Sequence, residues 1–184
     1  ERVENGLCAP CTGGGTRAAG DDLALGVDTV CTFPDSAALK AAVDNCIAVD
    51  STGVACCSHG ADCGAAGPVE MADWDVSLVT DMINLFNGKA SFNADISRWD
   101  VSSVRSMVNI FLNADAFNQH LSRWDVSSVT DMQGMFANNQ GGTPAFNTMP
   151  VGWDTSKVTN TAHFLMGATA WKARFTGGND NTLP

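Results

Sequence analysis

The chain from residue 69 to about residue 175 repeats one pattern of apolar and polar positions. The segment WDVSLVTDM begins at Trp74, returns with small changes at Trp99 and, after the same interval, at Trp124, and a weaker copy begins at Trp153. Aromatic residues keep the same register within the units, at positions 86, 111 and 136 and at positions 92, 117 and 146. A fixed period of this length predicts a repeat of stacked coils, in which each unit buries its apolar face against its neighbours.

Each unit also carries local signals for two short elements. Met82, Leu85 and Phe86 follow at helical spacing after Thr80 or Asp81, either of which can cap a turn, and Gly88 can end it. Residues 92–101 alternate roughly between apolar and polar side chains, which is typical of a short strand. These signals predict an α/β repeat solenoid with a short strand and a helical turn in every coil. A four-residue insertion at positions 138–144 of the third unit indicates a loop that bulges from one face.

The sequence before the repeat predicts an N-terminal capping helix and a small leader. Residues 36–47 are rich in alanine, with Ser36 or Asp35 as the N-cap, and they carry one apolar face made of Leu39, Val43, Cys46 and Ile47. Such a helix would cover the open end of the first coil. We therefore expect four parts: a cysteine-rich disulfide module at 1–32, the capping helix with a disulfide loop at 33–68, a four-coil solenoid at 69–175, and a polar tail at 176–184.

All seven cysteines lie before the repeat, at positions 8, 11, 31, 46, 56, 57 and 63. This segregation is typical of disulfides in an oxidising, extracellular setting. Cys46 on the helix can pair with Cys56 or with Cys57, leaving Cys63 to pair with the other, because neighbouring cysteines rarely bridge each other. The odd count leaves Cys8 to pair with a cysteine upstream of Glu1. A zinc site at Cys56, Cys57, His59 and Cys63 is the less favoured reading, because the ligand spacing is irregular.

Composition narrows the class of partner. The 184 residues are 45% hydrophobic and include 20 acidic against 10 basic residues, for a net charge of −10, which argues against nucleic acid and anionic membranes as partners. No apolar run is long enough to cross a bilayer, so no membrane insertion is expected. Because the chain opens with Glu1 rather than Met, we expect it to be a piece of a larger protein.

The repeat unit, FNxxISxWDVSSVxxM followed by an apolar residue and phenylalanine, resembles the bacterial surface protein repeat. This repeat is also called the BspA-like or mycoplasma lipoprotein repeat and is a relative of leucine-rich repeats. The resemblance covers residues 69 to about 175 and implies a leucine-rich-repeat-like, extracellular or surface-attached chain that binds, adheres or builds structure. The run from Cys8 to Cys31 is similar to cysteine-rich modules of protist and algal surface proteins, loosely like growth-factor and tumour-necrosis-factor receptor repeats. That second resemblance implies a disulfide between Cys11 and Cys31 and a microbial eukaryote as the source.

Two sets of repeated polar residues are candidate sites. Asp75, Asp100, Asp125 and Asp154 occupy equivalent positions, so they predict either a ladder that holds calcium between coils or four local turns in which each carboxylate accepts backbone N–H bonds. The turns are the favoured reading. A second set, made of Arg98, Arg123, Gln119 and His120, is either a binding face or simply the solvated side of the repeat.

Catalysis has little support in the sequence, and neither an enzyme nor a cofactor is expected. His59, His120 and His163 occupy unrelated positions, and no nucleophile, metalloprotease or phosphate-loop motif is present. We expect a non-enzymatic structural or adhesive interaction module of a secreted or cell-surface protein, with other extracellular proteins, copies of itself or the rest of a larger chain as partners. The alternative is a soluble module that binds a glycan or calcium. An ice-binding face is excluded because Arg105 interrupts the threonine row formed by positions 80, 130 and 159.

Overall fold

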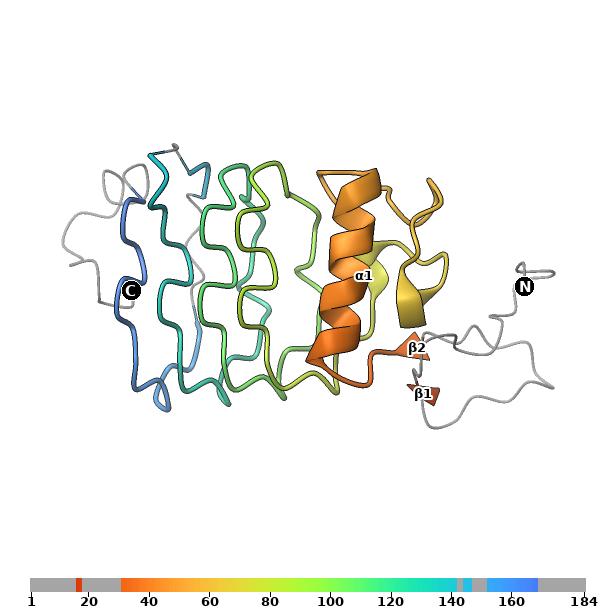
Figure 1. The fold of residues 1–184 in the computed structure, drawn as a ribbon. Helices are drawn as coiled ribbons and strands as arrows, with labels where there is room; N and C mark the ends of the chain where they lie inside the picture. Colours follow the sequence, from red (N-terminus) through yellow and green to blue (C-terminus); the bar gives the residue numbers. More distant parts are fainter. Residues whose placement is uncertain (1–15, 18–30, 142–143, 147–151, 169–184) are drawn as a thin grey trace.

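The computed structural model describes residues 16–17, 31–141, 144–146 and 152–168. Its named elements are strands β1 (Thr16–Arg17) and β2 (Cys31–Thr32), helix α1 (Ser36–Val49), and the 3₁₀ turns η1 (Gly64–Ala66) and η2 (Met71–Asp73). β1 and β2 pair antiparallel, and β2 continues into the segment that leads to α1. Beyond η2 the chain runs back and forth in coils that lie side by side, as Figure 1 shows.

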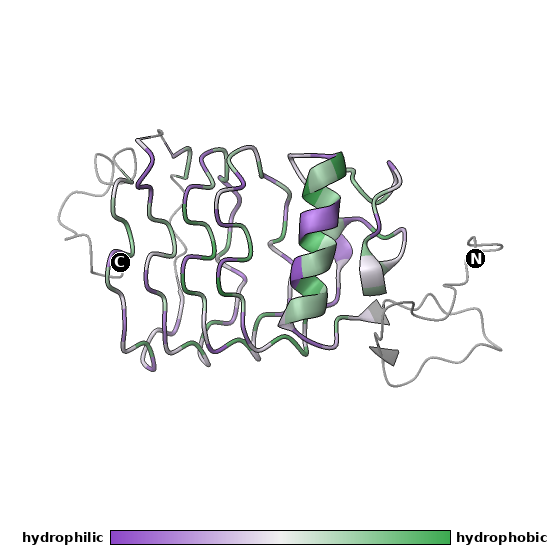
Figure 2. Ribbon diagram, in the orientation of Figure 1, coloured by the Kyte–Doolittle hydropathy of each residue, from purple (hydrophilic) through white to green (hydrophobic). Residues whose placement is uncertain are grey.

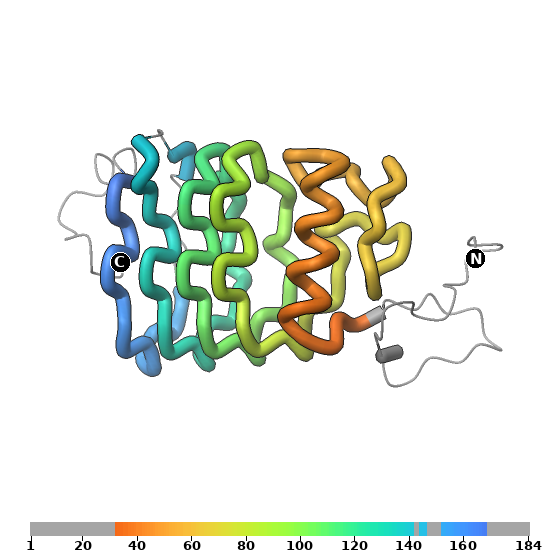
Figure 3. Tube along the Cα trace, in the orientation of Figure 1, coloured from red at the N-terminus to blue at the C-terminus, as the bar shows by residue number. Residues whose placement is uncertain are grey.

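The helix predicted before the repeat is confirmed as α1. Asp35 is its N-cap, and the Asp35 side chain accepts a hydrogen bond from the backbone N–H of Ala38 at 2.8 Å. Its buried residues are Leu39, Ala42, Val43 and Cys46. α1 lies alongside the first coil (Figure 3), where the ammonium group of Lys89 forms an ion pair of 2.7 Å with Asp44. Among the described residues, no helix is long and apolar enough to cross a bilayer.

Backbone hydrogen bonds join neighbouring coils in both directions; for example, the N–H of Arg105 donates back to the Thr80 carbonyl, and the N–H of Thr130 donates back to Arg105. Alternate N–H groups of one unit donate to carbonyls of the next unit, at a constant offset along the chain: Met82 to Ser106, Asn84 to Val108, Phe86 to Ile110 and Gly88 to Leu112. The second and third units repeat the same set of bonds, and single parallel bridges link Asp81, Ser106, Asp131 and Asn160. The units are therefore stacked in register, with equivalent residues on neighbouring coils.

The expectation of an α/β repeat solenoid with a strand and a helical turn per coil is wrong, and so is its comparison with a leucine-rich repeat. Among the described residues of the repeat, no strand is formed and η2 is the one helical element; the coils consist of turns, bends and single bridges. The physical reason lies at Asn84 and its equivalents, Asn109, Gly134 and His163, whose φ angles are between 54° and 60°. A left-handed residue in every unit interrupts the right-handed helix that the apolar spacing predicts. Alternate N–H groups, which a helix would use internally, donate to the neighbouring coil instead.

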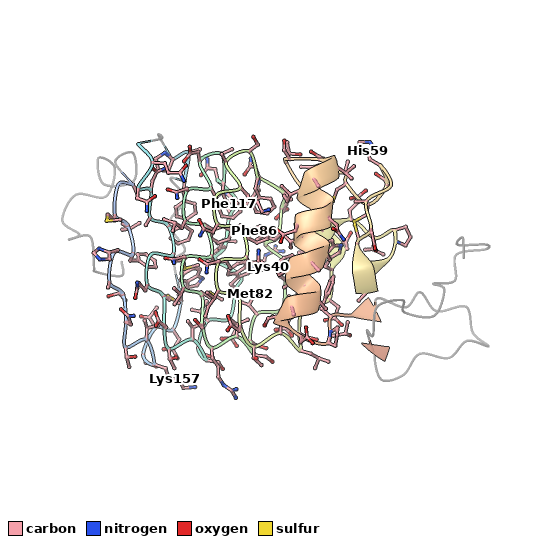
Figure 4. All side chains as sticks on the ribbon, viewed as in Figure 1. Lys40, His59, Met82, Phe86, Phe117 and Lys157 are labelled. Atoms are coloured by element: carbon pink, nitrogen blue, oxygen red, sulfur yellow. A yellow bond between two sulfur atoms is a disulfide. The ribbon has the colours of Figure 1, made fainter. Side chains whose placement is uncertain are left out.

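The core is a column of stacked aromatic rings. Phe86, Phe111 and Phe136 stack with centroids 5.5 Å apart, and Phe92 and Phe117 stack at 5.6 Å in a parallel column. Figure 4 shows Phe86 and Phe117 inside the stack, whereas Lys157 projects from one edge. Along the coils apolar and polar residues are closely interspersed (Figure 2). The repeated apolar positions are thus confirmed as the core, although the backbone that carries them is irregular.

Each repeat tryptophan also bonds to the preceding unit. The indole Nε1–H of Trp99 donates to the carbonyl of Met71 at 2.8 Å, and Trp124 donates to Ile96 at 3.0 Å. Trp153 completes the series with the carbonyl of Leu121 at 2.9 Å. The rings of Trp99 and Trp124 are buried and that of Trp153 is partly buried, while the one polar atom of each is satisfied, so each of these tryptophans fixes the register of two adjacent coils.

Candidate functional site

The four repeated aspartates each close a local turn. Asp75 Oδ1 accepts a hydrogen bond from the backbone N–H two residues on, at 3.0 Å, and Asp100, Asp125 and Asp154 repeat this bond at the same length. The hydrogen bonds from Ser127 lower the pKa of Asp125, and those from Ser156 do the same for Asp154. This is the turn geometry that the favoured reading of these residues requires.

Asp75 has an additional role at the start of the stack. Burial raises the pKa of its carboxyl group, but the hydrogen bonds from Thr32 and Ser77 outweigh burial and leave the pKa below its usual value. The Thr32 hydroxyl donates to Asp75 Oδ2 at 2.6 Å, and the N–H of Phe33 donates to the Asp75 carbonyl at 3.0 Å. Asp75 therefore ties the segment before α1 to the first coil.

A calcium ladder along these aspartates stays a prediction. Within the part of the chain that the structure describes, the ligand atoms that come within 4.8 Å of one another in a group of three belong to Cys46, Cys56 and Cys57, not to the aspartates. Those sulfur atoms are already bonded, because Cys46 pairs with Cys56 and Cys57 pairs with Cys63. Disulfide sulfurs are not the thiolates that a zinc ion binds.

The two disulfides form one of the two pairings that the sequence left open. Their Cα atoms lie 5.0 Å and 5.9 Å apart, and all four cysteines are buried between α1 and the loop that follows it. The Glu70 carboxylate accepts the backbone N–H groups of Cys57 and Ser58, which holds this loop to the start of the repeat. Cys8, Cys11 and the side chain of Cys31 lie outside the described residues, so the expected pairing of Cys11 with Cys31 and the upstream partner of Cys8 stay predictions.

A shallow hollow of 380 Å³ lies on the surface between the second and third units. Equivalent charged residues of both units line it, Arg98 and Arg123 together with Asp100 and Asp125, and Ser97, Trp99 and Val101 complete the lining. The hollow thus brings together two residues expected at a binding face and two expected at a calcium ladder. In the sequence, an arginine precedes and an aspartate follows both Trp99 and Trp124. The stacking of the two coils brings these four charged residues together in one hollow.

The other residues of the expected binding face do not line this hollow. The Gln119 amide donates to the carbonyl of Asn93 at 2.8 Å, and the Asn93 side chain also accepts the N–H of Asn118. These residues join the first unit to the second. His120 is exposed and is not among the residues that line the hollow, and His59 and His163 belong to distant parts of the sequence.

Comparison with known proteins identifies the repeat. No curated protein and no solved structure matches the chain. Residues 61–177, which include every repeat unit, match the family model described as "Mycoplasma protein of unknown function, DUF285". The chain therefore belongs to the DUF285 family.

Proposed function

We propose that this chain is a non-enzymatic, extracellular interaction module of a secreted or cell-surface protein, with a structural or adhesive role. The observation that carries the proposal is the presentation of identical polar side chains in rows on a tightly packed stack of coils. Asp100, Asp125 and Asp154 form one such row, and Thr130 and Thr159 belong to another. Rows of this kind offer the same contact several times, and repeated weak contacts add up to strong attachment.

Two further observations support an extracellular setting. The buried disulfides stabilise the part of the chain that covers the first coil, and disulfides persist mainly in oxidising compartments. The repeat unit also resembles BspA-like surface proteins, which are related to the family that this chain belongs to. The partners we propose are other extracellular molecules or copies of this chain.

Adhesion is tested with beads coated with the non-reduced chain. We expect these beads to cluster with one another, or to be retained on the matrix of cells, several-fold more than beads coated with reduced and alkylated chain. Equal retention of both kinds of bead, together with a constant 19.2 kDa mass in light scattering over a concentration series, would overturn the proposal. Repeating the scattering in millimolar calcium tests whether the aspartate row contributes.

A second candidate, binding of a glycan, is favoured by one specific observation. The hollow between the second and third units is concave and polar, with acidic and basic groups at fixed positions. Its volume lies in the range that small-molecule sites occupy, and its charged side chains can hydrogen-bond a polar ligand such as a glycan.

A further inference from the structure

The two arginines that line the hollow differ in their partners. Arg98 forms an ion pair with Asp73, with 2.5 Å between Nη2 and Oδ1. Arg123, at the equivalent position of the next unit, makes no hydrogen bond or ion pair among the described residues. The hydrogen bonds from Ser97 lower the pKa of Asp95 most, and the charge of Arg123 adds a smaller, longer-range contribution. The Arg123 side chain is exposed and available to a ligand. Its planar guanidinium group matches a carboxylate in a two-bond geometry.

The aspartates that line the same hollow have acceptor capacity left. Asp100 uses Oδ1 for the N–H and hydroxyl of Ser102, and Asp125 uses Oδ1 for the N–H of Ser127. A carboxylate has two oxygens with about four acceptor positions, so each aspartate can take further donors from a ligand. The lowered pKa of Asp125 keeps it ionised at neutral pH.

The charges of the hollow restrict the chemistry of its ligand. The two aspartates would repel a ligand of high negative charge, such as a sulfate or phosphate ester, and Arg98 is already paired with Asp73, so Arg123 is the cation that a ligand can engage. A neutral ligand would leave Arg123 without a partner. A single carboxylate flanked by hydroxyl donors can pair with Arg123 and donate to the aspartates at once.

We propose that the hollow binds an acidic saccharide unit, whose carboxylate is held by Arg123 and whose hydroxyl groups donate to Asp100 and Asp125. The volume of 380 Å³ lies in the range of small-molecule sites, which begins at roughly 300 Å³. The site combines residues of two adjacent units, so it forms only when the coils are stacked and is absent from a single unit. This inference rests on the proposed function, since it names the molecule to which an extracellular module would attach.

The test uses a short oligomer of 1,4-linked hexuronic acid as the probe and the matching neutral hexose oligomer as its control. Binding is followed by the NMR shift of the Arg123 side-chain N–H in the non-reduced, ¹⁵N-labelled chain, and by calorimetry. We expect the acidic oligomer alone to shift this signal. Arg123→Gln should weaken binding about tenfold or more, because a charge-assisted hydrogen bond is lost.

Arg105→Gln is the matched control variant. Arg105 is an exposed arginine of the same repeat and does not line the hollow, so its replacement changes the net charge equally and should leave binding unchanged. Both arginines are on the surface, so neither variant should unfold. Equal binding of the neutral oligomer, an Arg123→Gln variant that binds like the unsubstituted chain, or no binding of the acidic oligomer would each overturn the assignment. Equally strong competition by a short peptide with a free carboxylate would assign the hollow to peptide instead.

The bead assay separates this inference from the proposed function. Beads that adhere equally well with Arg123→Gln and with the unsubstituted chain would refute the saccharide site while leaving the adhesive module in place. Beads that fail to adhere, although the chain binds the acidic oligomer in solution, would refute the adhesive role and retain the site.

Discussion

Three glycines of the repeat predict a graded series of stability losses. Gly88, Gly134 and Gly167 all have φ between 60° and 75°, a conformation that favours glycine. They differ in what an added Cβ atom would meet. At Gly88 nothing lies within 4 Å, at Gly134 the atom would overlap the side-chain oxygen of Asn109, and at Gly167 it would overlap the backbone carbonyl of Asn138.

The expected losses follow from these surroundings. Gly88→Ala meets only the left-handed backbone cost of about 1–2 kcal/mol, partly offset by the reduced freedom of the unfolded chain, for a net loss of about 1 kcal/mol. Gly134→Ala must also displace the flexible end of Asn109, which adds about 1 kcal/mol, in the range of strained side chains. Gly167→Ala must move the backbone carbonyl of Asn138 on the neighbouring coil. Because the N–H of Asn138 also donates to the Met166 carbonyl, this backbone cannot shift easily, and we expect a loss above about 4 kcal/mol.

The free energy of unfolding is measured by urea titration of the non-reduced chain, with fluorescence of the buried tryptophans as the signal. The slope of the transition should stay constant for Gly88→Ala, so the shift of the midpoint reports stability alone. Gly88→Ala is the matched control for the other two, because it shares their backbone conformation without their close neighbours. A Gly167→Ala variant within about 0.5 kcal/mol of Gly88→Ala would refute the close stacking of the last described coil on the third.

Three further changes test other contacts. Asp75 has a lower pKa folded than unfolded, so its contribution is complete above the unfolded value of about 3.9 and is lost as the pH falls below it. Thr32→Val removes the hydroxyl bond, so urea titrations at neutral and acidic pH should show about 1–2 kcal/mol less acid-induced loss than in the unsubstituted chain; an unchanged pH dependence would contradict this. Trp124→Phe removes the indole N–H that donates to Ile96, whose carbonyl keeps the hydrogen bond from the Trp99 N–H, so the change should cost about 0.5–1.5 kcal/mol of unfolding free energy; a shift of the urea midpoint smaller than experimental error would count against the bond. Replacing Cys46 and Cys56 by alanine opens a cross-link between residues 10 apart in sequence and should cost about 2–3 kcal/mol in the same assay; a double variant as stable as the unsubstituted chain would show that the cross-link constrains little.

The sequence predicted the register and the core of the repeat, but not its backbone. Equivalent apolar positions had to face one interior, and Phe86, Phe111 and Phe136 do stack there. The prediction of a helical turn was wrong because the spacing of apolar residues indicates which side chains are buried, but not to which carbonyls the backbone N–H groups donate. One signal was present in the sequence: Asn84 and Asn109 share a position, and asparagine tolerates the left-handed conformation better than most residues.

The hollow was only partly predictable. Arg98 and Arg123 stood out as exposed charges between core positions, and Asp100 and Asp125 stood out as a row. Their assignment to one hollow depends on how the turns before and after each tryptophan project from neighbouring coils. That arrangement is set by contacts between separate units of the repeat, which no local pattern records.

The constant offset of the hydrogen bonds between coils makes the length of this molecule adjustable. Donors of the first unit find their acceptors at equivalent positions of the second, and donors of the second find theirs at the same offset in the third. A duplicated copy of residues 100–124 would therefore find, on each side, the same set of donors and acceptors that the neighbouring coils use now. Gene duplication can therefore lengthen such a chain, and deletion of a unit can shorten it, without the need for a new type of contact between coils. Every added copy would add one aspartate to the row and one charged hollow to the surface.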